Sequence, residues 1–163
     1  MDVKTCVMQL ITAFVGSLGF SCLFGMRRRH LIWAALGGVL TWGIYLVVSA
    51  WLREGFLPNL AASAFAIAWA EIMARVRKTP ATQFVIPAII PLVPGSSLYY
   101  ALASAVRGDL PEAKFYGSQT AQVALAIAAG ISFVVSLRQL FCWINGSLSR
   151  CSQTETRYAG LSV

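Results

Sequence analysis

Long apolar runs separated by short charged gaps make up most of this chain. We expect about five of them to cross a membrane as helices, over residues 5–26, 31–52, 56–74, 84–106 and 118–144. Each is close to the roughly 20 residues that a helix needs to cross about 30 Å of hydrocarbon. The predicted fold class is therefore all-α, a polytopic membrane protein. Residues 1–144 are predicted to form a single transmembrane domain, and residues 145–163 a polar, mobile cytoplasmic tail.

Composition supports a membrane protein and removes other classes. Hydrophobic residues make up 58% of the chain and charged residues 12%, against roughly 45–50% and about 25% in soluble domains. The net charge of +7 would suggest nucleic acid in a soluble protein, but here the basic residues flank apolar runs, so no nucleic-acid partner is expected. The cysteines form no CxxC pair and no histidine cluster accompanies them, so neither a metal site nor a cofactor is expected. The chain lacks a nucleotide-binding loop, so ATP is not expected to be the direct energy source.

The distribution of basic residues predicts the orientation. Cytoplasmic loops of membrane proteins carry an excess of Lys and Arg. With five spans, four basic residues fall on one side: Lys4, Arg53, Arg107 and Lys114. Nine fall on the other: Arg27, Arg28, Arg29, Arg75, Arg77, Lys78, Arg138, Arg150 and Arg157. We therefore expect the N-terminus outside and the C-terminus inside. A re-entrant fourth segment would change this parity.

Three predicted spans carry polar or small residues along one helical face. They are Thr5, Gln9, Thr12 and Gly16; Gly38, Thr41, Tyr45 and Ser49; and Gln119, Gln122 and Ala126. Such faces serve helix–helix packing in lipid, or they line a water-accessible pathway. The pattern alone leaves both interpretations open.

Glu71 is the acidic residue that lies well inside an apolar run. A carboxylate within the bilayer needs a partner or a proton. Arg75 follows one helical turn later on the same face, where the two side chains can pair. The pair is either an interfacial ion pair that closes the third span, or Glu71 is a proton-coupling carboxylate.

The predicted fourth span carries the most specific pattern, with three prolines followed by small and aromatic residues: Pro87, Pro91, Pro94, Gly95, Ser96, Ser97, Tyr99 and Tyr100. Proline removes a helical hydrogen bond, and Pro94 with Gly95 is expected to break the helix. We expect Ser96 and Ser97 to cap a second half-helix, whose first amides attract anions. Broken helices of this kind form substrate sites in transporters. A simple proline kink is the alternative.

The residues around Glu71 and the break resemble the threonine/serine exporter (ThrE-like) family, and specifically the small membrane subunit of its split two-component form. The resemblance rests on three segments: residues 70–75, residues 79–82, and the Pro-Leu-Val-Pro-Gly element of residues 91–95 with Tyr99. It implies a bacterial cytoplasmic (inner) membrane protein that acts with a second membrane subunit. Some members are linked to export of small dicarboxylates such as succinate.

The leading hypothesis is a subunit of a secondary-active exporter for threonine and serine, coupled to protons. Its predicted substrate-binding residues are Pro91, Pro94, Gly95, Ser96, Ser97 and Tyr99, and its coupling or ion-pair residues are Glu71 and Arg75. The alternatives are a dicarboxylate exporter subunit and a non-transporting assembly subunit. A homo-oligomer in the lipid bilayer also stays open. The chain has no HExxH motif and no nucleophile beside a candidate base, so we do not expect an enzyme.

Overall fold

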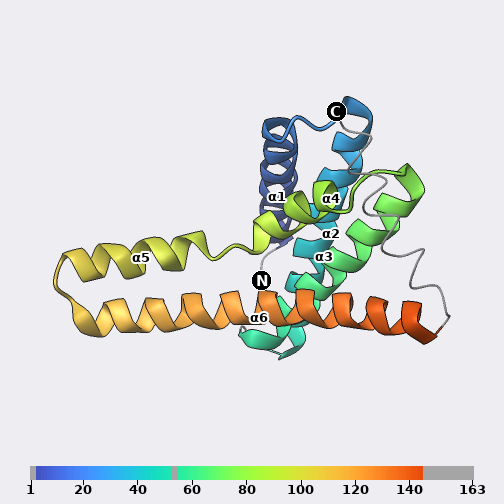
Figure 1. Ribbon diagram of the computed structural model, residues 1–163. Helices are drawn as coiled ribbons and strands as arrows, with labels where there is room; N and C mark the ends of the chain where they lie inside the picture. The colour runs from blue at the N-terminus through green and yellow to red at the C-terminus, as the bar shows by residue number, and fades with distance from the viewer. Residues whose placement is uncertain (1–2, 53–54, 145–163) are drawn as a thin grey trace.

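The computed structural model describes residues 3–52 and 55–144, and the regular elements in this part of the chain are all helical. Figure 1 shows them as α1 (Val3–Leu23), α2 (Arg28–Leu52), α3 (Phe56–Arg77), α4 (Thr82–Ile89), the short 3-10 helix η1 (Ile90–Leu92), α5 (Gly95–Val106) and α6 (Leu110–Ile144). The tail predicted over residues 145–163 lies outside the described residues.

The lengths and apolar character of these helices fit a membrane protein. Four of them, α1, α2, α3 and α6, are long and apolar enough to cross a membrane. The bent pair of residues 82–92 and α5 adds a fifth if it forms one span, with an angle of 56° between its halves. The protein is therefore an all-α, polytopic membrane protein, as its sequence predicts.

Small side chains fill the centre of the bundle that α1 to α4 form. Six alanines there have no exposed surface: Ala34, Ala35, Ala62, Ala66, Ala70 and Ala88. Alanine allows helix backbones to approach closely, which favours association in lipid. Larger side chains close the end where the α1–α2 and α3–α4 connections meet, because Met26, Met73 and Phe84 pack there in one cluster.

Two adjacent glycines of α2 mark the point at which other helices come closest. A Cβ on Gly37 would lie 2.8 Å from the Trp69 ring of α3. A Cβ on Gly38 would overlap Ser17 of α1 and lie 3.1 Å from the Pro87 carbonyl oxygen of α4. Of the two interpretations of the polar face on α2, helix packing is therefore the correct one at Gly38.

The long helix α6 packs across α3 and runs transverse to α1 (Figure 1). A Cβ on Gly130 would overlap the Ser63 hydroxyl and lie 2.7 Å from the Leu60 carbonyl oxygen. Ala126, one turn earlier, has no exposed surface. Glycine and alanine thus allow α6 to contact the α3 backbone directly.

α6 begins at Leu110, which extends it on the N-terminal side of the predicted span 118–144. Asp109 acts as the N-terminal cap, because its Oδ1 accepts a hydrogen bond from the Glu112 backbone N–H at 3.3 Å. Pro111 fits the first turn, where its missing N–H is not needed. The signal for this early start is present in the sequence as Asp-Leu-Pro-Glu.

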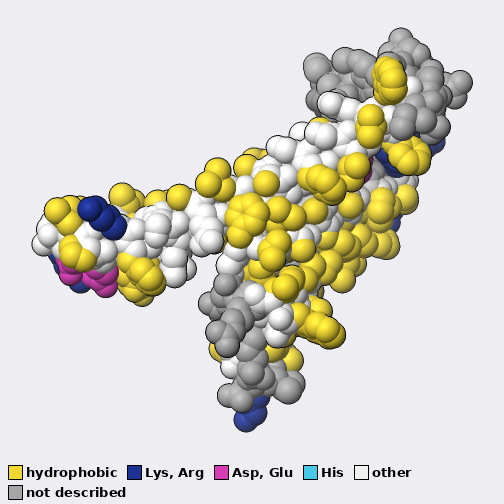
Figure 2. Space-filling view, turned by 90° about the horizontal axis from the view of Figure 1, so that it is seen from below, with side chains coloured by type: hydrophobic (Ala, Val, Ile, Leu, Met, Phe, Trp, Pro, Cys, Tyr) yellow, Lys and Arg dark blue, Asp and Glu magenta, His cyan; other side chains and the backbone are white. Residues whose placement is uncertain are grey.

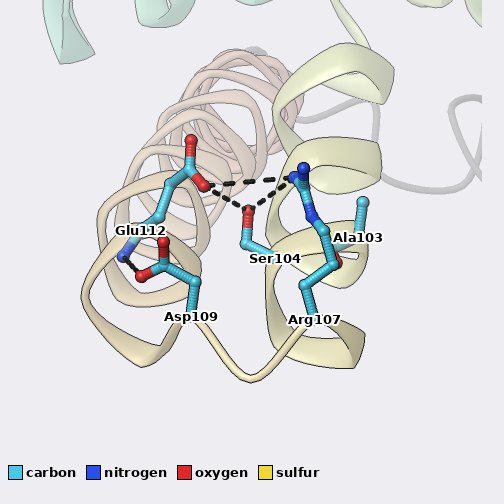
Figure 3. Close-up of polar contacts among 5 residues, drawn as sticks. All are labelled: Ala103, Ser104, Arg107, Asp109 and Glu112. Carbon is cyan, nitrogen blue, oxygen red and sulfur yellow. Dashed lines mark hydrogen bonds and ion pairs between the residues drawn. The ribbon is translucent and has the colours of Figure 1, made fainter.

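We call α5 together with residues 110–122 of α6 the arm. It projects from the bundle in Figure 1, and Figure 2 shows it from below as a separate extension. Among the described residues, α6 is the helix against which α5 packs extensively. At the arm's end, the Ser104 hydroxyl donates to Glu112 Oε2 at 3.0 Å, and Arg107 lies 4.0 Å from the same oxygen (Figure 3). These contacts hold the two helices of the arm together.

Candidate functional site

The break in the predicted fourth span begins one residue before Pro94. Val93 has φ −62° and ψ 124°, an extended conformation, whereas the residues up to Leu92 are helical. A residue that precedes proline is driven out of the helical region by the proline ring. Pro94 then occupies the N-cap position of α5. The structure thus confirms that the helix is discontinuous at this point.

One backbone carbonyl group near the break, that of Pro87, lacks its usual hydrogen-bond donor within the helix. In a regular helix the N–H of residue 91 would donate to the Pro87 carbonyl, but Pro91 has no N–H. The Ser17 hydroxyl of α1 donates to this carbonyl instead, at 2.9 Å, and Ser17 has no exposed surface. A side chain of another helix therefore stabilises the broken segment, as a polar backbone group in an apolar interior requires.

The predicted substrate residues divide between the bundle and the arm. Pro91 lies half-buried in η1, which packs against α1, α2 and α3. Gly95 and Ser96 are exposed at the start of α5, and Ser97 is half-buried. The prediction that the two serines cap α5 is wrong, because both lie within the first turn. The Ser97 hydroxyl donates back to the Pro94 carbonyl at 3.2 Å.

The first backbone amides of α5 are free to attract an anion, as the sequence predicts. Leu98 N donates to the Pro94 carbonyl at 3.1 Å. Amides before that position in a helix have no intrahelical acceptor, so Ser96 and Ser97 present theirs outward. Gly95 has open space around its Cα and does not adopt a positive φ. The prolines, and not Gly95, therefore account for the break.

An aromatic surface follows directly on α5. Tyr99 is 67% exposed, and its ring packs edge-on against Tyr100 at 5.6 Å between centroids. Tyr100 in turn contacts Tyr116 of α6 at 5.4 Å. The rings of Tyr99 and Tyr100 border an open groove of about 550 Å³, which is also lined by Leu102, Ala103, Val106 and Arg107.

Glu71 lies between two arginines, of which sequence reasoning found one. Its Oε2 is 3.8 Å from Arg75, the predicted partner, whose side chain is 69% exposed. Its Oε1 is 3.3 Å from Arg138 of α6, whose side chain is 25% exposed. The Glu71 side chain itself is 13% exposed. The carboxylate thus joins α3 to α6, with Arg138 as the closer and more enclosed partner.

The two groups of predicted residues are separate. Within the described part of the chain, neither Glu71 nor Arg75 forms a hydrogen bond or ion pair with a residue of the break. Glu71 contacts the far half of α6, whereas the break adjoins the arm. Any coupling between them therefore passes through α6 or through the helices of the bundle.

Comparison with known families identifies the class of protein. Residues 9–137 match the family model of the threonine/serine exporter ThrE. The chain belongs to this family. The match extends from α1 to α6, so it includes Glu71, the break and the arm of this ThrE-family protein. No solved structure matches the chain.

Three residues that shape this ThrE-family protein escaped sequence reasoning as contacts. The sequence predicts Arg138 only as a basic residue of the cytoplasmic side, and neither Ser17 nor Gly130 lies on a predicted polar face. Charged residues in apolar helices commonly pair with one another, so a pair between Arg138 and Glu71 could be predicted from the sequence. Nothing in the sequence around Ser17 or Gly130 indicates which helix each one meets.

Proposed function

We propose that this chain is one subunit of a secondary-active exporter for threonine and serine, and that it acts with a second membrane subunit. Membership of the threonine/serine exporter family supports the substrate class. The proposal of a second subunit rests on the arm. Among the described helices, α5 of the arm packs extensively on α6 alone. Because the second half of the broken span lies in the arm and not in the bundle, one side of the break has no protein of this chain packed against it.

Polar side chains on the arm support a protein partner in place of lipid. Gln119 and Gln122 are exposed, and within the described residues they make no hydrogen bond. Both lie in the apolar helix α6, which is a candidate span. An amide in hydrocarbon is costly, whereas a second membrane protein can supply donors and acceptors.

The substrate is proposed to bind at the break. Its carboxylate would accept hydrogen bonds from the amides of Ser96 and Ser97, at the positive end of the α5 dipole. Tyr99 or Tyr100 would offer a hydroxyl to the substrate's polar side chain. The open space around Gly95 keeps the approach to these amides clear. The partner subunit would close the opposite side.

Glu71 remains a candidate for proton coupling. Protonation of this carboxylate would weaken its ion pairs with Arg138 and Arg75 and loosen the contact between α3 and α6. Export would then depend on pH through this side chain. Glu71→Gln should flatten the pH dependence of export, and an unchanged pH profile in that variant would leave Glu71 with an ion-pair role alone.

Efflux from cells preloaded with a threonine-containing dipeptide tests the proposal. The chain is expressed alone, with its partner subunit, and with neither. We expect faster threonine efflux when both chains are present. Gly95→Leu should then abolish efflux and preserve co-purification, because it fills the approach to the amides without disturbing a contact. Loss of co-purification in this variant would favour an assembly subunit.

Export of small dicarboxylates is the second candidate. The observation that favours it is the excess of positive charge where the α1–α2 connection meets the end of α3, with Arg27, Arg28, Arg29, Arg77 and Lys78. Succinate efflux from the same three strains distinguishes the two substrates. Succinate efflux without threonine efflux would replace the leading proposal.

A further inference from the structure

Polar atoms without partners collect at one end of the bundle, which we call the basic end. It comprises the α1–α2 connection, the last turn of α3 and the start of α4, whose residues Met26, Ala74 and Phe84 pack in one cluster. Three buried side-chain atoms here have no hydrogen-bond partner among the described residues: His30 Nδ1, Arg77 Nε and Thr79 Oγ1. A buried polar group without a partner costs about 1–3 kcal/mol. These three atoms are therefore candidates to bind a ligand that supplies hydrogen bonds.

The missing partner is a hydrogen-bond acceptor. Arg29 Nε donates to His30 Nε2 at 3.2 Å. Since that ring nitrogen accepts, the neutral ring carries its proton on Nδ1, which is then a donor. Arg77 Nε is always a donor, and the Thr79 hydroxyl can donate. His30 is 2% exposed, so its Nδ1 is not simply turned to bulk solvent.

Packing fixes two of these donors, the Arg77 guanidinium and the His30 ring, in position. The Arg77 guanidinium lies 4.8 Å from the centroid of the Trp33 ring, which is one turn after His30 on α2. The His30 ring packs edge-on against Phe84 of α4 at 6.2 Å. Thr79 N donates to the Ala74 carbonyl at 3.1 Å, which turns the chain back against the end of α3.

The positive charge of the basic end also favours the binding of an anion. Arg27, Arg29 and Arg77 all act electrostatically on the His30 ring. Glu71, the acid nearest to this end on α3, is already held by Arg138 and Arg75. Within the described residues, five cations of the basic end have no carboxylate partner: Arg27, Arg28, Arg29, Arg77 and Lys78. The N-termini of α2 and α4 lie here together with the C-termini of α1 and α3, so the positive charge of the basic end comes from its side chains and not from helix dipoles.

We propose that the basic end is a binding site for an oxyanion, held by His30 Nδ1–H, Arg77 and the Thr79 hydroxyl. Two sources share this chemistry: the carboxylate of a small dissolved molecule and the phosphate of an anionic phospholipid. Both present oxygen acceptors with negative charge, which form strong hydrogen bonds to arginine. The site is distinct from the break and stands whether or not the chain transports threonine.

The single histidine of the chain provides a direct readout. The full chain is labelled with [¹⁵N]histidine, purified through a tag without histidine, and reconstituted into phosphatidylcholine vesicles. Nitrogen spectra of the imidazole are recorded while succinate or inorganic phosphate is added at constant ionic strength, with chloride as the balancing salt. We expect a saturable shift of the Nδ1 resonance, because that nitrogen donates to the bound anion.

Matched variants separate a specific site from general charge. Arg77→Lys keeps the charge and removes the Nε–H, and should weaken the apparent affinity by roughly tenfold or more, as loss of a hydrogen bond to a charged group does. Lys78→Gln removes a full charge from an exposed neighbour and should change it by about twofold or less. Thr79→Val, which keeps the side-chain shape, provides a second test if Arg77→Lys fails to fold.

The outcomes decide both the site and its source. Saturation by succinate or phosphate in the neutral vesicles supports a small dissolved anion. No response to either, with a shift when phosphatidylglycerol replaces part of the phosphatidylcholine, supports a lipid phosphate. An Nδ1 resonance that responds to none of the three overturns the proposal. So does a Lys78→Gln variant that weakens binding as much as Arg77→Lys.

Discussion

Glu71 carries a charge inside an apolar helix, and two arginines pair with it. Its carboxylate is 13% exposed and has one enclosed arginine and one exposed arginine as partners. A removed partner leaves an enclosed charge unsatisfied, whereas an exposed pair contributes little because solvent screens it. The two arginines should therefore differ in their effect on stability although both contact the same side chain.

We expect Arg138→Ala to lower the free energy of unfolding by about 1–3 kcal/mol, because it removes the closer and less exposed partner of Glu71. Arg75→Ala is the matched control and should cost no more than about 0.5 kcal/mol. Denaturation of the purified protein in mixed micelles measures both values. Equal losses for the two variants would mean that α6 does not hold Glu71 as described.

Ser17 tests the account of the broken helix. Ser17→Ala removes the donor to the Pro87 carbonyl and should lower the free energy of unfolding by about 1–3 kcal/mol, the cost of an unsatisfied buried acceptor. Ser49→Ala is the control, since the Ser49 hydroxyl bonds within its own helix to the Leu46 carbonyl. It should be close to neutral in the same denaturation assay. A neutral Ser17→Ala would mean that water or another group satisfies the carbonyl.

At the scale of the elements, α3 and α6 form the contact that connects the arm to the bundle. Gly130→Ala should destabilise the protein, because its Cβ would overlap the Ser63 hydroxyl and press on the α3 backbone. Gly117→Ala in the same helix meets open space and should instead stabilise it by about 0.5–1 kcal/mol. Thermal unfolding in detergent gives the two signs. A stabilised Gly130→Ala variant would contradict the close α3–α6 crossing.

The elements were more predictable than their contacts. The apolar runs predicted the helices, and the dipeptide Val93-Pro94 contains the reason for the break, because steric effects of proline act on its immediate neighbour. The Ser17–Pro87 hydrogen bond joins residues 70 positions apart. Its formation depends on how α1 and α4 align, which no local pattern specifies. The Arg138–Glu71 pair likewise depends on the crossing of α3 and α6.

At the scale of the whole molecule, the helices of the bundle pack on one another, whereas α5 of the arm packs extensively on α6 alone among the described helices. The bundle satisfies its broken helix internally and closes its centre with alanine. The arm exposes Leu102 and Val106 on one side of α5, and Gln119 and Gln122 on α6. Apolar and amide groups together suit a protein surface better than lipid alone. The arm is therefore the surface at which we expect the second subunit of the exporter.

Site-specific photo-crosslinking tests this location. A benzoylphenylalanine placed at Leu102 of the arm, which is 60% exposed, should form a covalent adduct with the mass of this chain plus the co-expressed partner. The same group at Val47 of α2, which is 63% exposed on the bundle, should give no such adduct. Because the two positions are similarly exposed, a difference in crosslinking between them would not result from a difference in accessibility. An adduct with the mass of two copies of this chain from Leu102 would assign the arm to a homo-oligomer, and an adduct from Val47 alone would place the partner on the bundle.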